Sequence, residues 1–330
     1  MDEVSTDPRD YYQAKYQSVG DLPGCGPATA QKLGEIGFKT VQSIATATSR
    51  KLLEAGVGEA TAQKIIEAAR KSLELRFITA EELAKIYADK KKITTGCSSL
   101  DNLLEGGIET HSITEFFGEF GSGKSQICQQ LAVTVQLPVE KGGLDGSCLY
   151  IDTEQVFRSD RVIDMATYVG LDPKKALKGI IYASAYTSEH QSVLLEQCDE
   201  VVKENNVRLI IIDSMTAHFR SEFPGREFLA PRQQKLNQHL HKLKRLCMSF
   251  KAAAVVTNQV SANPDSYSGP QRPQAIGGNI MGHAAHTRTY LRKGRNNLRI
   301  AKIVASPFLP EGEAPFRITE RGIESDEDVG

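Results

Sequence analysis

Apolar and polar positions follow two different patterns along this chain. From Ile93 onward, short β-rich apolar runs alternate with stretches of helical spacing, which is typical of a parallel α/β sheet. The run Leu209–Ile212 is continuously apolar and predicts a strand buried on both faces. A helix is predicted where Ile127, Leu131 and Val135 recur at four-residue intervals. We therefore expect an α/β fold whose core is a mainly parallel, twisted sheet.

The pattern near the N-terminus is different, because one motif occurs twice. Gly24–Leu33 and Gly56–Ile65 share G-x-G-x-A-T-A-Q-K followed by an apolar residue, at an offset of 32 residues. The glycines permit a tight turn, and the following positions predict a helix with Leu33 or Ile65 on its buried face. We expect a helix-hairpin-helix pair, a small all-α domain over residues 19–72. Its helix N-termini offer backbone N–H groups to phosphate, so sequence-independent DNA contact and a purely structural or protein-binding role both remain open.

The other segments divide the chain around these two domains. Residues 1–18 are expected to form an N-terminal tail, and residues 324–330 a disordered acidic tail. Residues 73–95 are expected to be a linker without strands, with a short helical pattern and one isolated large aromatic residue, Phe77. The α/β core is then expected to occupy residues 96–323.

Composition limits the function without identifying it. The 330 residues carry 40 basic and 41 acidic side chains, a net charge of −1, so any polyanion must be bound by local clusters or backbone amides. We expect no membrane partner, because no apolar run approaches the ~20 residues of a membrane span, and we expect no secretory signal. Six scattered cysteines without a Cys-x-x-Cys pair suggest neither a zinc finger nor a disulfide framework and favour a reducing compartment.

A glycine-rich loop carries the strongest chemical signal. Residues 118–125 match G-x-x-x-x-G-K-[ST] in full, between a β-rich apolar stretch and the helix predicted at Ile127. Backbone amides of such a loop cradle phosphates, Lys124 neutralises the β- and γ-phosphate oxygens, and the Ser125 hydroxyl binds Mg²⁺. The residues expected to bind ATP here are Gly118, Glu119, Phe120, Gly121, Ser122, Gly123, Lys124 and Ser125.

Acidic residues at two predicted strand ends complete this candidate site. Asp213 follows the strand Leu209–Ile212 and is expected to hold Mg²⁺ through water, although Asp-Ser also commonly begins a helix as its N-cap. Glu154 follows the strand Cys148–Ile151 and is the candidate base for the attacking water, while Asp152 is expected to be a positioning or capping acid. Because the carboxyl ends of parallel strands converge on one crevice, we expect these residues to lie together.

These features together resemble one family, the RecA-type DNA strand-exchange proteins in their archaeal RadA and eukaryotic recombinase branch. The resemblance covers residues 20–323 and is most specific at Gly106–Thr110, Asn258–Val260, Ile276–Asn279 and Ser306–Glu311. It implies a RecA-like ATPase core that uses ATP and Mg²⁺, forms filaments on single-stranded DNA and exchanges strands with homologous double-stranded DNA during repair. It also implies recombination mediators as partners, and a location in the archaeal cytoplasm, or in the nucleus if the source is eukaryotic.

The resemblance further implies roles for residues around the nucleotide. Arg158 would stack on the adenine, and Gln259 would sense the γ-phosphate, so that Lys124, Glu154 and Gln259 form the catalytic set. His283 would approach the γ-phosphate of a neighbouring subunit. The alternatives are a strand-end hydrogen bond for Gln259 and an ordinary loop histidine for His283.

A proline-flanked lid is implied beside that subunit boundary. Pro307 and Pro310 would stiffen the segment Ser306–Pro310 over the adenine of the adjacent subunit. The family usually carries an aspartate immediately before this segment, where it helps to bind cations, whereas this chain has Ala305. Because alanine offers no oxygen ligand, we expect weak or absent stimulation of the ATPase by potassium.

Two long, turn-rich loops would bind DNA by the same resemblance. They are expected over residues 219–231 and 260–282, without secondary structure, and would hold the DNA backbone with little base readout. Solvated loop charges are the alternative interpretation. The residues assigned to DNA are Arg220, Arg226, Arg232, Arg272, Gly277 and Gly278.

Self-assembly is implied by the isolated aromatic residue of the linker. Phe77 and Ala80 match the family's F-x-x-A motif, so Phe77 would fill an apolar pocket of the neighbouring subunit that includes Ala183 and Ala185. The linker would also add a strand to the neighbour's sheet edge. Such a head-to-tail homo-oligomer is a helical filament or a ring. A plug into the chain's own core is the alternative.

Two other classes of protein share parts of this pattern. A non-exchanging accessory paralogue would sense ATP and load or regulate a recombinase, but such relatives often lack the helical domain, the F-x-x-A segment or a complete second loop. A ring helicase of the same core fold is disfavoured by the helix-hairpin-helix repeat and by Phe77.

Overall fold

The chain forms two structural units. A computed structural model describes residues 16, 18–72, 79–88, 90–225, 227–261 and 274–326. One unit comprises Met1–Lys90 with Val193–Glu204, and the other comprises Lys91–Ser192 with Asn205–Gly330.

The first unit is helical throughout its described part. Its elements are η2 (Val19–Asp21), α1 (Pro27–Glu35), α2 (Val41–Ala45), α3 (Ser49–Glu54), α4 (Glu59–Ser72), α5 (Ala80–Ala88) and α11 (Asp199–Glu204), and α10 (Ser188–Gln197) spans both units. Leu33 and Ile65 are fully buried, as their spacing in the repeat predicts, and they pack with Ile44 and Leu52. Helix α5 confirms the short helical pattern expected in the linker.

The two copies of the repeat begin with the same turn. Gly24 has φ +91° and Gly56 has φ +72°, a region that other residues rarely adopt. Each glycine lies three residues before its helix, α1 at Pro27 and α4 at Glu59. The repeated sequence therefore specifies a repeated turn and helix start.

The second unit is built on one large sheet in its described part. Its nine strands have the order β13-β12-β11-β10-β3-β7-β6-β4-β5. Neighbours from β10 to β5 pair in parallel, and β10 to β13 pair antiparallel. The strands are β3 (Ile113–Gly118), β4 (Ser147–Asp152), β5 (Ile180–Ser184), β6 (Val207–Asp213), β7 (Ala253–Asn258), β10 (Thr287–Lys293), β11 (Leu298–Ala305), β12 (Glu313–Thr319) and β13 (Gly322–Glu324).

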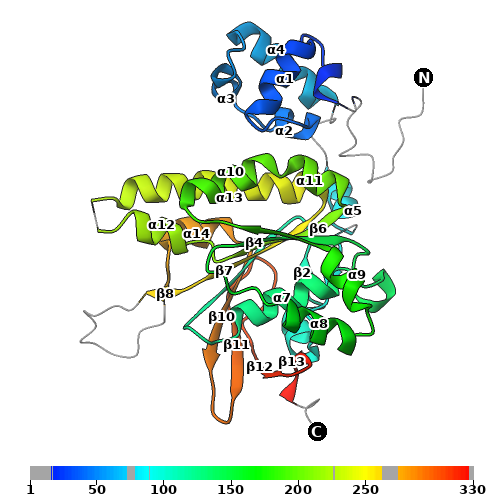
Figure 1. Ribbon diagram of the computed structural model, residues 1–330, viewed down its shortest axis with the longest axis vertical. Coiled ribbons are helices and arrows are strands. Elements are labelled where there is room, and N and C mark those ends of the chain that lie inside the picture. The colour runs from blue at the N-terminus through cyan, green and yellow to red at the C-terminus, as the bar shows by residue number, and fades with distance from the viewer. Residues whose placement is uncertain are drawn as a thin grey trace. The chain divides into compact units, whose positions relative to one another are not determined.

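Helices cover both faces of this sheet. Helix α13 lies along one face, and α7 and α8 lie on the other (Figure 1). The helices of this unit are α6 (Ser98–Leu103), α7 (Lys124–Thr134), η3 (Val139–Lys141), α8 (Ser159–Tyr168), α9 (Pro173–Lys178), α12 (Ala217–Glu222), α13 (Leu229–Phe250) and α14 (Gly278–Ala284).

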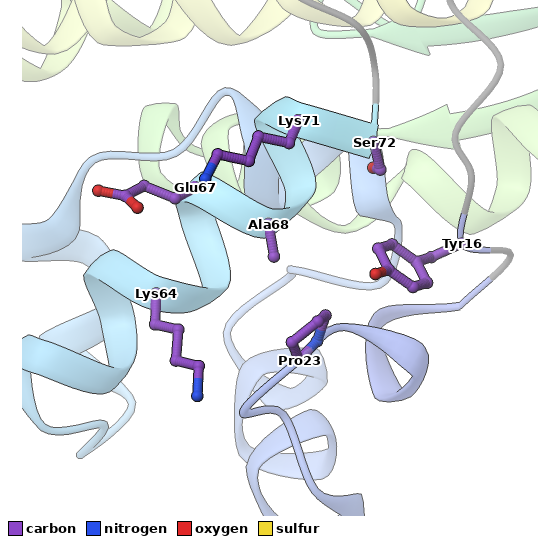
Figure 2. A pocket seen from close by; sticks show the side chains of 7 residues that line it. All are labelled: Tyr16, Pro23, Lys64, Glu67, Ala68, Lys71 and Ser72. Atoms are coloured by element: carbon purple, nitrogen blue, oxygen red, sulfur yellow. The ribbon is translucent and has the colours of Figure 1, made fainter. Parts of the chain in front are cut away.

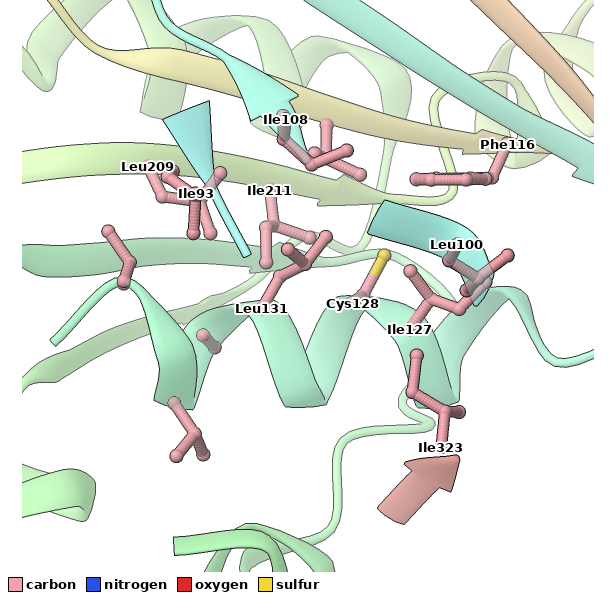
Figure 3. Close-up of a cluster of buried hydrophobic side chains, with 14 of the residues drawn as sticks. Ile93, Leu100, Ile108, Phe116, Ile127, Cys128, Leu131, Leu209, Ile211 and Ile323 are labelled. Carbon is pink, nitrogen blue, oxygen red and sulfur yellow. The ribbon is translucent and has the colours of Figure 1, made fainter. Parts of the chain in front are cut away.

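The core of the second unit lies between α7 and the sheet. Ile127 and Leu131 of α7 belong to one buried cluster with Leu209 and Ile211 of β6, and Leu131 points toward Ile211 (Figure 3). The whole run Leu209–Ile212 is fully buried, which confirms the prediction of a strand covered on both faces. The polarity pattern thus identifies the strand at the centre of the fold.

Three expectations about irregular segments are wrong in the described residues. The linker ends in a strand, β1 (Lys92–Ile93), because Ile93 is buried in the core and β1 pairs with β2 (Ile108–Glu109). The segment 219–231 is only in part a loop, because α12 covers residues 219–222 and α13 covers residues 229–231. The acidic tail is ordered through Asp326, because Ser325 is buried and Asp326 pairs with Arg317.

The loop expected over residues 260–282 also contains regular structure. Strand β8 (Val260–Ser261) pairs antiparallel with β9 (Gln274–Ala275), and α14 follows at Gly278. Residues 262–273 between them lie outside the described residues. The described parts of this segment are therefore a two-stranded neck and a helix.

All six cysteines are buried and free, in line with a chain that needs no disulfides. Within the described ranges, no helix combines the length and apolar character that crossing a membrane requires.

Candidate nucleotide-binding site

The candidate site lies at the carboxyl ends of four adjacent parallel strands. Gly118 ends β3, Asp152 ends β4, Asp213 ends β6 and Asn258 ends β7. Asp152 is the register partner of Asp213, and Phe117 is the partner of Asn258. The strand arrangement therefore brings together the polar residues that the sequence places after its apolar runs.

The loop between β3 and α7 needs its glycines. A Cβ atom at Gly118 would lie 2.1 Å from the carbonyl oxygen of Leu291, so no larger residue fits. Gly121 and Gly123 have φ values of +75° and +104°, and Gly123 is the N-cap of α7. The buried hydroxyl of Ser122 has no hydrogen-bond partner among the described residues. A cradle of this shape, ending in an open helix N-terminus with an unsatisfied hydroxyl, fits a phosphate chain.

The amine of Lys124 closes over the same loop. Its Nζ donates hydrogen bonds to the carbonyl oxygens of Gly118 and Glu119, both at 2.9 Å. Burial lowers the pKa of Lys124, and the nearby carboxylates of Asp213 and Glu154 oppose this effect. The lysine thus lies between the loop and the two acids, where its positive charge can bind a further anion.

Asp213 is buried beneath this loop and is held by hydroxyl groups. The Tyr150 hydroxyl donates to Oδ2 at 2.9 Å, the Thr257 hydroxyl donates to Oδ1 at 2.5 Å, and Ser125 also forms a side-chain hydrogen bond with it. Burial raises the pKa of Asp213, and these hydroxyl hydrogen bonds partly offset the effect. The N-cap of α12 is Thr216, so Asp213 does not cap that helix.

Glu154 and Gln259 meet across the site. Gln259 Nε2 donates to Glu154 Oε1 at 3.0 Å, although the residues are far apart in the sequence. Asp152 fixes the turn that carries Glu154, because its carboxylate accepts from the backbone N–H groups of Glu154 at 3.1 Å and Phe157 at 3.0 Å. Gln259 thus links the strand end of β7 to the candidate base.

Comparison with known proteins identifies the family. A family model described as Rad51 matches residues 88–326, more than half of the chain. The chain belongs to the Rad51 family. A second model, a SAM-like helix-hairpin-helix tandem, matches residues 17–71, which confirms the predicted helix-hairpin-helix pair and, with the α/β sheet, the predicted fold class.

Two curated relatives of the Rad51 family cover almost the whole chain. Both are named DNA repair and recombination protein RadA. The one from Aeropyrum pernix is 53% identical over 312 residues, 94% of this chain and 98% of the relative. The one from Ignicoccus hospitalis is 48% identical over 333 residues, 99% of this chain and 100% of the relative. The resemblance to the RadA branch is therefore confirmed.

Several residues assigned from the Rad51-family pattern lie on the surface. Glu119, Phe120, Arg158, His283, Pro307 and Pro310 have exposed side chains, and Phe120 is 91% exposed. Arg158 is the N-cap of α8, and its backbone N–H donates to Gln129 Oε1 at 3.3 Å. In the described part of the chain, no hydrogen bond joins these side chains to the cluster of Lys124, Asp213 and Glu154.

The residues assigned to DNA are only partly described. Arg220 is exposed on α12, and Arg232 lies on α13, where its guanidinium donates to the Phe223 carbonyl at 3.2 Å. Both arginines are therefore on helices rather than on a loop. Gly277 is the left-handed N-cap of α14 and Gly278 its first residue. The other two, Arg226 and Arg272, lie outside the described residues.

The structure describes only some of the residues assigned to self-assembly. Phe77 lies outside the described residues, and Ala80 is the first residue of α5. Ala183 is half-buried on β5, the edge strand of the sheet. Ala185 is buried within its own chain, next to the Asp152 carbonyl that accepts its N–H.

Two polar side chains beneath the site were not anticipated from the sequence. Tyr150 and Thr257 donate to Asp213 from the neighbouring strands β4 and β7. The available signal was a polar residue inside an otherwise apolar strand, which must find a partner when it is buried. The partner itself is set by strand order, which the sequence does not state.

Proposed function

We propose that this chain is a DNA-dependent ATPase that polymerises on single-stranded DNA and exchanges homologous strands. The printed names of both curated relatives refer to DNA repair and recombination. These relatives match over nearly their full length, which favours a complete recombinase over an accessory paralogue. The observation that carries the proposal is the hydrogen bond between Gln259 and Glu154, because it connects the nucleotide edge to the segment that follows β7.

The nucleotide part of the proposal assigns ATP to the loop 118–125. The backbone N–H groups and the free Ser122 hydroxyl bind the phosphates, and Lys124 leaves its two carbonyl partners to neutralise their charge. Ser125 and Asp213 are the residues that hold Mg²⁺, which supplies charge neutralisation on the phosphate oxygens. Arg158 contacts the adenine, with Glu119 and Phe120 at the loop tip.

The chemical step assigned to the chain is removal of a proton from water. Glu154 is exposed at the site and can accept that proton, while Asp152 fixes the backbone of its turn. In this structure, Gln259 holds the Glu154 carboxylate by a hydrogen bond from its side-chain amide. A γ-phosphate that attracts the Gln259 amide would release Glu154, so that nucleotide state and the position of residue 259 change together.

Assembly follows from an unpaired sheet edge. Strand β5 pairs with β4 on one side, and its other side is the edge of the described sheet. The linker of a second copy, with Phe77 and Ala80, would add there beside Ala183 and Ala185. His283, Pro307 and Pro310, which are exposed in one chain, would then face the nucleotide of the adjacent subunit.

DNA contact is assigned to two regions. In the second unit, Arg220, Arg226, Arg232 and Arg272 neutralise phosphates, and Gly277 and Gly278 allow close backbone approach. In the helical unit, a cavity of about 400 Å³ is lined in part by Lys64, Lys71 and Tyr16 (Figure 2). Lys64 belongs to the second repeat, and its side chain lies beside Gly24 of the first. These lysines support backbone contact by the repeat.

Electron microscopy tests the proposal most directly. The full chain is incubated with single-stranded DNA and a non-hydrolysable ATP analogue, and separately with ADP. Regular helical polymers with the analogue, together with joint-molecule formation from homologous duplex DNA, are expected. Discrete particles and no joint molecules would instead identify an accessory paralogue, and closed rings that unwind duplex DNA would identify a helicase.

A further inference from the structure

Thr153 joins the turn that carries the candidate base to the strand that carries the buried acid of the site. It is a buried residue directly after β4, between Asp152 and Glu154. Its backbone N–H donates to the Asp213 carbonyl at 2.8 Å, at the end of the β4–β6 pairing. Its side chain bonds to Ser214, the first residue after β6.

The hydroxyl of Thr153 makes two hydrogen bonds with that one residue. Its Oγ1 accepts from the backbone N–H of Ser214 at 2.8 Å and donates to the Ser214 carbonyl at 2.9 Å. The side chain thus satisfies both backbone groups of Ser214 at the point where the two strands end. Thr153 is 7% exposed and Ser214 is 1% exposed, so water is poorly placed to replace either bond.

The turn after Thr153 is held from its other side by Asp152. The Asp152 carboxylate accepts from the backbone N–H of Glu154 at 3.1 Å, and the Asp152 carbonyl accepts from the N–H of Ala185 at 2.8 Å. These two bonds shape the turn and tie it to the end of β5, but neither reaches β6. Beyond the strand ends, the distance between Glu154 and Asp213 therefore depends on Thr153.

We propose that Thr153 is a positioning residue for ATP hydrolysis, which fixes the Glu154 carboxylate relative to Asp213. The inference rests on the proposed function, which assigns proton removal to Glu154 and Mg²⁺ to Ser125 and Asp213. A base must lie within hydrogen-bond reach of the water that it deprotonates, and a misplacement of about 1 Å can cost about 100-fold in rate. Thr153 acts through Glu154, because its described hydrogen bonds are all with backbone groups of the chain.

Two substitutions separate the hydroxyl of Thr153 from its shape. Thr153→Val keeps nearly the same volume but can neither donate nor accept, so both backbone groups of Ser214 lose this partner. Thr153→Ser keeps the hydroxyl and is the rescue variant. Thr134→Val is the matched control, because it removes another buried threonine hydroxyl, which donates to the Thr94 carbonyl at 2.6 Å at the end of α7 away from the phosphate loop.

Steady-state ATP hydrolysis by the full chain with oligo-dT is the first measurement. In Thr153→Val we expect kcat to fall by about 10- to 100-fold while KM for ATP stays within about threefold, because the loop 118–125 is unchanged. Thr153→Ser should keep kcat within about threefold of the unaltered chain, and Thr134→Val should leave it unchanged. In a Glu154→Gln background, which already lacks the base, Thr153→Val should change the rate by less than about twofold.

A second measurement needs no nucleotide. Hydrogen–deuterium exchange followed by mass spectrometry reports how firmly the turn after β4 is held. Thr153→Val should speed exchange in peptides that contain Glu154 or Ser214, whereas Thr153→Ser should not. Thr134→Val should speed exchange only near Thr94 and the end of α7. Equal exchange around Glu154 in Thr153→Val and in the unaltered chain would overturn the positioning role.

The outcomes separate this inference from the proposed function. Absence of DNA-stimulated ATPase activity in the unaltered chain overturns both. An unchanged kcat in a folded Thr153→Val overturns the positioning role alone, and so does an equal fall in Thr134→Val, which would indicate a general loss of stability. A fall that Thr153→Ser rescues and that the Glu154→Gln background abolishes supports the role. If circular dichroism shows that Thr153→Val does not fold, Thr153→Ala, which also lacks the hydroxyl, decides by the same criteria.

Discussion

Two of the carboxylates buried in the sheet, Glu115 and Asp213, have surroundings of different kinds. Glu115 is ion-paired with Arg288 at 2.5 Å and accepts from Asn258 at 2.8 Å, so a permanent cation of the chain balances its charge. Asp213 accepts from the neutral hydroxyls of Tyr150 and Thr257, and its pKa is raised by burial. A buried charge that is directly ion-paired within the fold serves structure, whereas one whose direct hydrogen-bond partners are hydroxyls is suited to an external cation.

Removing the Glu115 carboxylate is expected to have the largest effect of the changes considered, and the effect is on stability. Glu115→Ala leaves Arg288 without its partner and the Asn258 amide with an unused donor, so the free energy of unfolding should fall by about 3–5 kcal/mol. Urea unfolding followed by circular dichroism measures the change. Asp326→Ala, which breaks the partly exposed ion pair with Arg317, is the control and should cost less than about 1 kcal/mol. Equal losses in the two variants would contradict the comparison.

Lys124→Ala should weaken nucleotide binding without lowering stability, whereas Glu115→Ala is expected to lower stability. Burial disfavours the charged lysine, as its lowered pKa indicates, so its removal should not lower stability. Affinity for a fluorescent ATP analogue should fall by about 100-fold or more, because a cation aimed at phosphate is lost. Fluorescence titration measures this, with Lys302→Ala, which removes a half-buried lysine paired with Glu313, as the control. Retained nucleotide affinity would remove the loop 118–125 from the proposed site.

Asp213→Asn tests the second carboxylate directly. The ordinary pKa of an aspartate is 3.8 in the unfolded chain, and burial raises it in the folded chain. The stability contribution of this group is therefore complete below the unfolded pKa and is lost as pH rises through the folded pKa. An asparagine cannot ionise, so at neutral pH the nucleotide-free variant should be more stable than the unaltered chain.

The same variant should lose the Mg²⁺ dependence of nucleotide binding. Thermal unfolding without nucleotide and titration of the ATP analogue with and without Mg²⁺ measure the two effects. Asp164→Asn changes an exposed carboxylate of α8 and should alter neither. A less stable Asp213→Asn would mean that the protein itself compensates this charge.

The two carboxylates also differ in how far the sequence predicts them. Asp213 follows four apolar residues, and a charge at the end of a buried strand points to the ligand edge of a parallel sheet. Glu115 lies inside the β-rich stretch Ile113–Phe117, and its partner Arg288 is 173 residues away. Local pattern therefore predicts the strand, the phosphate loop and the terminal acid. The pairings that satisfy Glu115 and Asn258 depend on strand order.

The segment 219–231 shows a second reason for error. Its glycine, proline and charged residues indicate a loop, but Phe219 is buried against the ring of His239 on α13. That contact stabilises α12 and, with the buried Leu236 and Leu240, extends α13 back to Leu229. Tertiary packing thus overrides the local signal and puts Arg220 and Arg232 on helices.

The smallest expected effect concerns a carboxylate that this chain lacks. Ala305 ends β11 and is the register partner of Arg288, the cation that neutralises Glu115. With no oxygen ligand at this position, the DNA-stimulated ATPase should show no potassium-specific gain when potassium chloride replaces sodium chloride at equal ionic strength. Ala305→Asp should restore a gain, because it supplies the carboxylate that the family usually has. Ala305→Asn, which adds an uncharged oxygen of the same reach, should restore less. A large potassium-specific gain in the unaltered chain would show that other oxygens form the cation site, and Ala305 would then have no bearing on the salt response.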